Sequence, residues 1–174
     1  MSKIGLFFGP LKGSVNRVAE KVKTALGEQN IDMISVNDTS AENLESYDKI
    51  IFGISTVGKE TWDSDFSNTD WSKFFPNISK VDYSGKTVAI FGLGDSVTYA
   101  NHFVNAMGVL AKQLLKNGAT IVGKVDPASY EFEESDAIFD GMFIGLPIDE
   151  DFQPELTDER VSNWVNDIKP AFGL

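Results

Sequence analysis

The chain has 174 residues, of which 15 are basic and 26 acidic, so its formal net charge is −11. This length predicts a single domain over residues 1–174 that buries a core without cross-links. The absence of cysteine and the presence of one histidine, His102, exclude thiolate zinc sites, iron–sulfur clusters and multi-histidine sites, so we expect no metal. The acidic balance argues against nucleic acid and anionic membranes as partners.

The negative charge is concentrated towards the end of the chain. Residues 1–125 contain 13 basic and 13 acidic side chains, whereas residues 126–174 contain 2 and 13. Two interpretations stay open, namely a solvated flank that aids solubility and a docking face for a basic partner. The first apolar run, residues 4–8, is too short for a signal peptide or a membrane span, so we expect a cytoplasmic protein.

The first half of the chain alternates between predicted strands and helices. Residues 4–8 are continuously apolar, as in a parallel strand covered on both faces. Apolar positions with helical spacing follow over residues 15–26. Residues 31–36 alternate in polarity and predict a strand near the sheet edge, whereas residues 49–54 and 87–91 predict two further buried strands.

The second half continues this alternation with one interruption. A helical face over residues 103–114 ends at Asn117-Gly118, and residues 120–125 predict a fifth strand. Residues 126–155 are interpreted as an insertion on that strand, with weak strand candidates at 130–132 and 142–145. A closing helix presents apolar residues from Val161 to Phe172, with Thr157 as its expected N-cap.

Five strands alternating with helices predict an α/β fold with a doubly wound parallel sheet. Ligands of such sheets bind beyond the carboxyl ends of the strands. The loop after the first strand offers backbone N–H groups from Leu11 to Val15, with the Lys12 ammonium and the Ser14 hydroxyl, which suits an anion. A plain strand-to-helix turn eased by Gly13 remains the alternative, because neither a Walker A nor a dinucleotide motif is present.

The loops after the third and fourth strands offer aromatic and glycine residues. Gly92 and Gly94 allow a ligand to approach the backbone, and Tyr99 can cover a flat heterocycle. Trp62 provides a second aromatic side chain. A phosphate cradle with an aromatic wall therefore points to a mononucleotide with a planar ring, although both features also occur in ordinary turns.

With these loops, the whole chain resembles the long-chain flavodoxins, which are FMN-dependent electron carriers and not enzymes. The matching segments are residues 3–9, 64–66, 91–95, 99, 105–108, 130–135, 143–146, 149–151, 156–157, 164 and 172–174. The resemblance implies strand order 2-1-3-4-5, a monomer, and partners of the ferredoxin/flavodoxin reductase type together with low-potential oxidoreductases. The cofactor-binding residues expected for FMN are Leu11, Lys12, Gly13, Ser14, Val15, Thr56, Val57, Gly58, Lys59, Leu93, Gly94, Asp95, Tyr99 and His102.

The sequence departs from the family pattern in both cofactor loops. Pro10, Lys12 and Val15 stand where the family carries threonines, and Pro10 has no N–H to donate. Val57 stands where the family stacks a tryptophan on the flavin. Losing about 100 Å² of apolar contact costs about 2.5 kcal/mol of binding free energy, which Trp62 is a candidate to restore.

Two alternatives therefore accompany the electron-carrier hypothesis. The first is a flavodoxin-fold binding or regulatory module that has lost FMN or takes another ligand in the same cleft. The second is a phospho-receiver domain, which is poorly supported, because Gly9-Pro10 and Ser55-Thr56 occupy the positions where that fold needs acidic residues.

Overall fold

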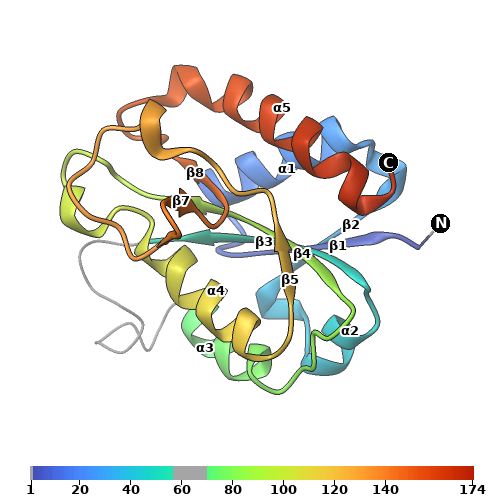
Figure 1. Cartoon of the computed structure of the whole chain (residues 1–174). Coiled ribbons are helices and arrows are strands. Elements are labelled where there is room, and N and C mark those ends of the chain that lie inside the picture. Colours follow the sequence, from blue (N-terminus) through green and yellow to red (C-terminus); the bar gives the residue numbers. More distant parts are fainter. Residues whose placement is uncertain (1, 57–69) are drawn as a thin grey trace.

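The computed structural model describes residues 2–56 and 70–174. A parallel sheet with the order β2-β1-β3-β4-β5 forms its centre, as the sequence predicts (Figure 1). The strands are β1 (Ile4–Phe8), β2 (Ile31–Ser35), β3 (Lys49–Ser55), β4 (Thr87–Leu93) and β5 (Thr120–Val122). The inner strands β1, β3 and β4 are almost wholly buried, which explains their continuous apolar sequences.

The fifth strand of the sheet is built from two separate segments. β5 pairs with the first half of β4, and β8 (Leu146–Ile148) pairs in parallel with its second half, through Phe91, Gly92 and Leu93. The predicted strand over residues 120–125 therefore ends early. Residues 146–148, expected within an insertion over 126–155, belong instead to the main sheet.

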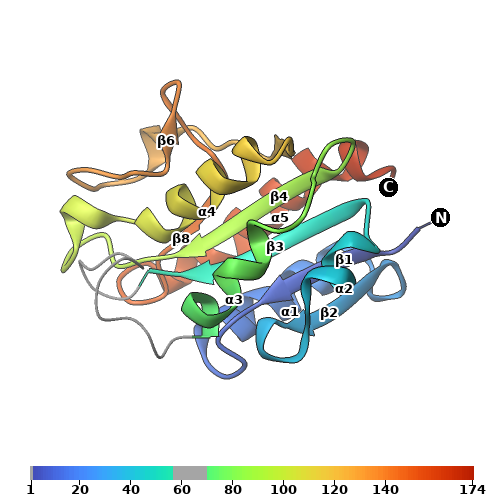
Figure 2. The same ribbon diagram turned by 90° about the horizontal axis from the view of Figure 1, so that it is seen from below.

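Helices cover both faces of the sheet, so the molecule has three layers (Figures 1 and 2). α1 (Ser14–Leu26) and α5 (Thr157–Ile168) lie together on one face. The other face carries α2 (Ala41–Glu45), α3 (Asp70–Ile78) and α4 (Asn105–Lys116). Short 3₁₀ turns occupy Glu28–Asn30, Val36–Asp38, Ala100–His102, Pro127–Ser129, Pro154–Leu156 and Lys169–Phe172.

Each face of the sheet has its own apolar core. On the α1/α5 face, Phe91 of β4 meets Trp164 of α5 edge-on, with ring centroids 6.4 Å apart. On the other face, Phe52 of β3 packs against Trp71 of α3, whose indole N–H donates to the Gly53 carbonyl oxygen at 3.0 Å. Because aromatic side chains lock helices to both faces, the carboxyl ends of the strands form a fixed platform for the loops.

Two expectations at helix ends are wrong. Thr157 is the first residue of α5 rather than its N-cap, and its hydroxyl donates to Glu150 Oε2 at 2.8 Å. Phe103 lies before α4, which begins only after Val104 in a left-handed conformation (φ 50°). The predicted end of α4 at Asn117-Gly118 is confirmed.

An aromatic cluster holds the excursion between β5 and β8. Tyr130, Phe132 and Phe143 surround Phe103 with ring centroids 5.7–6.0 Å from its ring. Of the two strand candidates here, 142–145 is partly confirmed, because the hairpin β6 (Ile138–Phe139) and β7 (Met142–Phe143) forms there. Residues 130–132 are not a strand. The excursion therefore buttresses the connection between β4 and α4.

Candidate functional site

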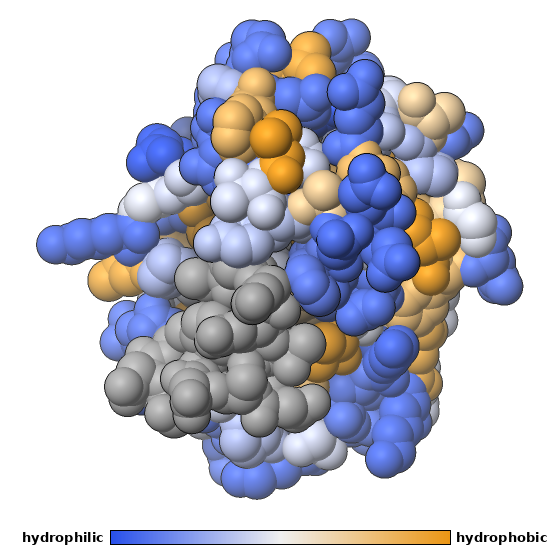
Figure 3. All heavy atoms as spheres, turned by 90° about the vertical axis from the view of Figure 1, so that its left-hand side faces the viewer, coloured by the Kyte–Doolittle hydropathy of each residue, from blue (hydrophilic) through white to orange (hydrophobic). Residues whose placement is uncertain are grey.

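The loops that follow β1, β3 and β4 leave the sheet at its carboxyl edge, the edge that faces the viewer in Figure 3. Gly9 N–H donates to the Gly53 carbonyl oxygen at 3.3 Å, and Thr56 N–H donates to the Leu93 carbonyl oxygen at 2.9 Å. These two bonds fix the starts of the three loops side by side. The expected site residues therefore originate from one edge.

The loop after β1 presents unpaired backbone donors. Gly13 is the N-cap of α1, with φ 109° and no side-chain cap. The first helical hydrogen bond runs from the Arg17 N–H to the Gly13 carbonyl oxygen at 3.1 Å. Within the part of the chain that the structure describes, the N–H groups of residues 11–15 have no acceptor. A helix N-terminus in this state favours an anion.

The side chains of this loop divide into two groups. Leu11, Lys12 and Gly13 are exposed and Ser14 is half-buried, whereas Val15 is 2% exposed and packs into the core. Val15 can therefore contribute its N–H and not its side chain. Across residues 2–56 and 70–174, no carboxylate forms an ion pair with Lys12.

The loop after β3 is described only as far as Thr56. The Thr56 hydroxyl oxygen accepts the N–H of Ala106 at 2.9 Å, so this side chain caps the start of α4. The predicted site residues Val57, Gly58 and Lys59, the tryptophan Trp62 and the motif at 64–66 lie outside the described residues.

The loop after β4 is tightly folded. Gly94 N–H donates to the Ile148 carbonyl oxygen at 3.0 Å, and a Cβ at Gly94 would lie 2.9 Å from the Val104 nitrogen, so only glycine fits. One carboxylate oxygen of Asp95 accepts the N–H groups of Val97 and Thr98 at 3.1 and 2.7 Å. The loop therefore presents Tyr99, which is 37% exposed, on a fixed backbone.

His102 has a defined tautomer. Asp136 N–H donates to Asn105 Oδ1 at 2.8 Å, which leaves Asn105 Nδ2 as a donor towards His102 Nδ1 at 3.2 Å. His102 Nδ1 is consequently an acceptor, and the proton of the neutral ring sits on Nε2. The half-buried His102 thus offers a single N–H to a ligand.

The sequence does not reveal the role of Asp149, whose carboxylate holds the loop after β4 through hydrogen bonds. Asp149 is 1% exposed, and one carboxylate oxygen accepts Ser96 N–H and O–H at 3.2 and 2.5 Å. The other oxygen accepts the N–H groups of Asp151 and Phe152 at 3.0 and 2.9 Å. A buried carboxylate that accepts four hydrogen bonds stabilises the groups around it strongly. Asp149 therefore connects the end of β8 to the loop that carries Tyr99.

A groove of about 610 Å³ separates this loop from the excursion between β5 and β8. Its lining combines apolar side chains with acids: Ser96, Val97, Ala100, Tyr130, Glu131, Phe132, Glu133, Phe152 and Gln153. Val97 and Phe152 are 62% and 49% exposed. Close by, desolvation and then repulsion from Asp95, Asp149 and Glu150 raise the pKa of Asp151. The groove therefore combines polar and acidic side chains with exposed apolar ones.

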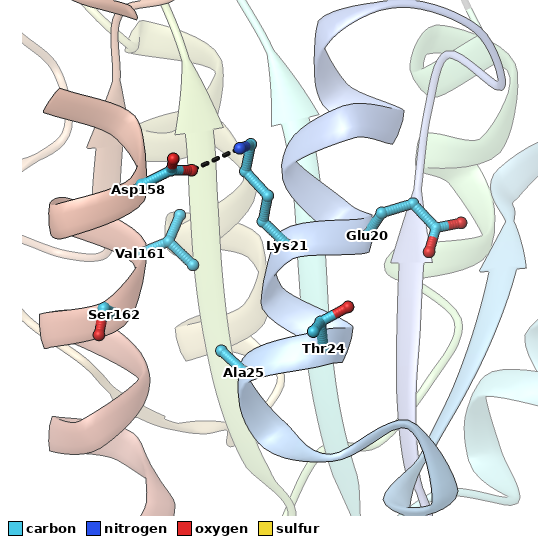
Figure 4. Close-up of a pocket in the computed structure, with 7 residues that line it drawn as sticks. All are labelled: Glu20, Lys21, Thr24, Ala25, Asp158, Val161 and Ser162. Atoms are coloured by element: carbon cyan, nitrogen blue, oxygen red, sulfur yellow. Dashed lines mark hydrogen bonds and ion pairs between the residues drawn. The ribbon is translucent and has the colours of Figure 1, made fainter. Parts of the chain in front are cut away.

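A second hollow, of about 360 Å³, lies between α1 and α5 (Figure 4). Lys21 crosses it to pair with Asp158, and Ala25 and Val161 line it. It sits between helices on one face of the sheet rather than at the ends of the strands. Its charged groups Lys21 and Asp158 already pair with each other, so they do not offer a free polar group to a ligand.

Comparison with known proteins identifies the family of this chain. The sequence profile of the family described as Flavodoxin matches residues 6–164. This chain belongs to the flavodoxin family. It is 43% identical to a flavodoxin of Picosynechococcus over the full length of both chains, and 41% identical to Flavodoxin 1 of Escherichia coli over 100% of this chain and 97% of that one.

The fold of this flavodoxin is shared by solved structures. Fusobacterium nucleatum flavodoxin bound to flavin mononucleotide superposes with a TM-score of 0.87 at 25% identity, over 98% of this chain and 99% of that one. Its K13G mutant, also bound to flavin mononucleotide, gives the same TM-score at 26% identity. Flavodoxins are electron carriers and not enzymes. Along residues 2–56 and 70–174, no helix is both long and apolar enough to cross a membrane.

Proposed function

We propose that this flavodoxin binds FMN at the carboxyl edge of the sheet and carries electrons at low potential between redox enzymes. The observation that carries the proposal is the row of N–H groups after β1 that have no acceptor among the described residues, flanked by Lys12, on the same edge as the fixed loop that presents Tyr99. The donors suit a phosphate and the exposed ring suits a flat heterocycle, so the residues present fit FMN.

The phosphate belongs in the first loop. The N–H groups from Leu11 to Val15 and the Ser14 hydroxyl donate hydrogen bonds to it, and the Lys12 ammonium supplies the charge that replaces the family's missing threonine hydroxyls. The structure supports this arrangement because Lys12 is exposed and has no carboxylate partner among the described residues.

The ring belongs between the other two loops. Tyr99 would cover one face of the ring, the backbone from Leu93 to Asp95 would contact the ring, and His102 would line its edge with the Nε2 proton. Thr56 begins the loop on the opposite side, and Val57, Gly58 and Lys59 complete it in this proposal. The loop after β4 is cross-linked by Asp149, so it needs little reordering when a ring binds.

FMN, when bound, supplies the electron-transfer chemistry. The chain holds the cofactor, excludes water from the ring faces and sets the local electrostatic potential. Asp95 belongs to the loop that carries Tyr99, and Asp151 is close enough to Asp95 for their charges to repel. Both carboxylates disfavour additional negative charge on a bound flavin. This repulsion keeps the reduction potential low.

The proposed redox partners would bind at the groove that carries Glu131 and Glu133. We propose ferredoxin/flavodoxin reductases and low-potential oxidoreductases that present basic residues to Glu131 and Glu133, with apolar side chains against Val97 and Phe152. In this proposal residues 1–174 form one domain, and the protein acts as a cytoplasmic monomer without nucleic-acid, membrane or metal partners.

The test is the visible spectrum of the purified protein mixed with FMN and passed through a gel-filtration column. An electron carrier retains one FMN per chain with a shifted spectrum and quenched fluorescence. A protein that elutes colourless and leaves free FMN unchanged would instead be the FMN-free binding module with the same fold.

A further inference from the structure

Arg17 is a second cation near the first loop, and it is not among the site residues predicted from the sequence. It lies in the first turn of α1, and its guanidinium Nη2 donates to Ser14 Oγ at 2.8 Å. Within the described residues no carboxylate lies within ion-pair distance of Arg17. Arg17 and Lys12 are therefore two uncompensated cations beside one row of unpaired N–H groups, in a chain whose net charge is −11.

The position of Arg17 is electrostatically unfavourable without an anion. The N-terminus of a helix is the positive end of its dipole, where acidic residues stabilise and basic residues destabilise. The first turn of α1 has no acidic residue, whereas α3 begins with Asp70 and α5 carries Asp158 and Glu159 in its first turn. A bound anion would remove this repulsion at α1.

We propose that Arg17 is a positioning residue for the phosphate, which acts through Ser14 and, with Lys12, makes the loop select the phosphorylated flavin over riboflavin. This inference rests on the proposed FMN-binding function. It goes further by assigning a residue and a selectivity to the phosphate end of that site.

The hydrogen bond defines how Arg17 acts. Its N–H occupies a lone pair of Ser14 Oγ, so the Ser14 O–H is left to donate towards the loop. The positive charge also polarises that hydroxyl and makes it a stronger donor. One oriented hydroxyl and two cations thereby replace several neutral hydroxyls.

The test measures the dissociation constants of FMN and riboflavin for the apoprotein and its variants. Arg17→Ala should weaken FMN binding about tenfold and change riboflavin binding less than twofold, because only FMN carries the phosphate. Arg17→Lys should retain part of the preference, because it keeps the charge and loses the planar donor geometry.

A double-variant cycle tests whether Arg17 acts through Ser14. Ser14→Ala should also weaken FMN binding, and the combined variant should lose less than the product of the two separate losses. Lys116→Ala, at the far end of α4, is the control, because it changes the net charge equally and should leave the FMN-to-riboflavin ratio unchanged. Thermal unfolding of the apoproteins should show no loss of stability for Arg17→Ala, since the substitution removes a cation from the positive end of a helix.

The outcomes separate the two proposals. If the wild-type apoprotein does not bind FMN, the proposed function fails. If it binds FMN and Arg17→Ala keeps the wild-type ratio between FMN and riboflavin, the function stands and the role of Arg17 is overturned. Equal losses for both flavins would likewise overturn it, because they would indicate a general effect on the fold.

Discussion

The first loop and the segment that follows β5 have opposite electrostatics. The first loop carries Lys12 and Arg17 with no carboxylate partner among the described residues. Residues 126–159 carry 12 acids and no base, and desolvation, followed by repulsion from Asp95, Asp149 and Glu150, raises the pKa of Asp151. The difference teaches that the net charge of −11 is not a uniform property of the surface. The basic end suits an anionic ligand and the acidic end suits a basic partner.

The two regions also differ in how they are held. Backbone N–H groups in the first loop have no acceptor among residues 2–56 and 70–174, whereas the loop after β4 is held by hydrogen bonds of Asp149, Asp95 and the Gly94 N–H. The phosphate end therefore gains its hydrogen bonds when a ligand binds. The loop after β4 already has most of its hydrogen bonds, so substitutions that remove these bonds act mainly on stability.

The largest expected effect tests the pre-formed ring end. Asp149→Ala leaves the N–H groups of Ser96, Asp151 and Phe152 without their acceptor and should lower the free energy of unfolding by about 3 kcal/mol. Urea unfolding of the apoprotein measures it. Glu155→Ala, an exposed acid close by, is the control and should change stability by no more than about 0.5 kcal/mol. If Asp149→Ala leaves the free energy of unfolding unchanged, the loop does not depend on the hydrogen bonds of Asp149.

The next effect concerns the face of the ring opposite Tyr99. Val57→Trp should strengthen FMN binding by about 1–3 kcal/mol, because it restores an aromatic side chain at the family's stacking position. Fluorescence titration measures the change. Riboflavin should gain equally, since both flavins share the ring. An unchanged affinity would mean that another side chain, with Trp62 as the candidate, already covers that face.

The Lys12 charge should have a smaller effect because Lys12 is exposed and screened by water. Lys12→Ala should weaken FMN binding by about 1–2 kcal/mol and leave riboflavin nearly unchanged. Titration with each flavin at low salt gives the two losses. Losses of equal size for both flavins would show that Lys12 does not contact the phosphate. The first loop would then have one cation fewer for an anionic ligand.

The smallest effect tests the acidic side. The raised pKa of Asp151 means that folding disfavours its charged form, so its contribution is most favourable below the unfolded pKa and is lost as the pH rises through the folded value. Asp151→Asn should therefore raise stability at pH 7 by a few tenths of a kcal/mol. Thermal unfolding at pH 7 and pH 4 measures this. A gain that does not shrink towards pH 4 would contradict the explanation by desolvation and like-charge repulsion.

Most of the architecture follows from the sequence, because buried parallel strands have continuous apolar runs and α1 and α4 have clear helical faces. The split fifth strand does not. Leu146-Pro147-Ile148 is short and contains a proline, which is tolerated because β8 pairs only with β4 among the strands that the structure describes. The sequence does not predict α2 or α3 either, because α2 has only five residues and α3 contains Pro76.

The sequence predicts candidate site residues where a loop has a distinctive composition, as at Gly94 and Lys12. Asp149 and Arg17 were not predictable, since their roles come from partners placed by the fold. Asp149 stands in a run of acids that all look alike in sequence, and only the packing of β8 beside β4 brings it under Ser96. Arg17 has an ordinary place on a polar helix face until its bond to Ser14 is seen.

The most direct test of the account is the wild-type apoprotein's affinity for FMN and for riboflavin, each measured by fluorescence quenching at low and at high ionic strength. The account predicts that FMN binds more tightly than riboflavin, and that added salt weakens FMN binding while riboflavin binding stays constant, because salt screens only the phosphate contacts with Lys12 and Arg17. Equal affinities for the two flavins at low salt would contradict it.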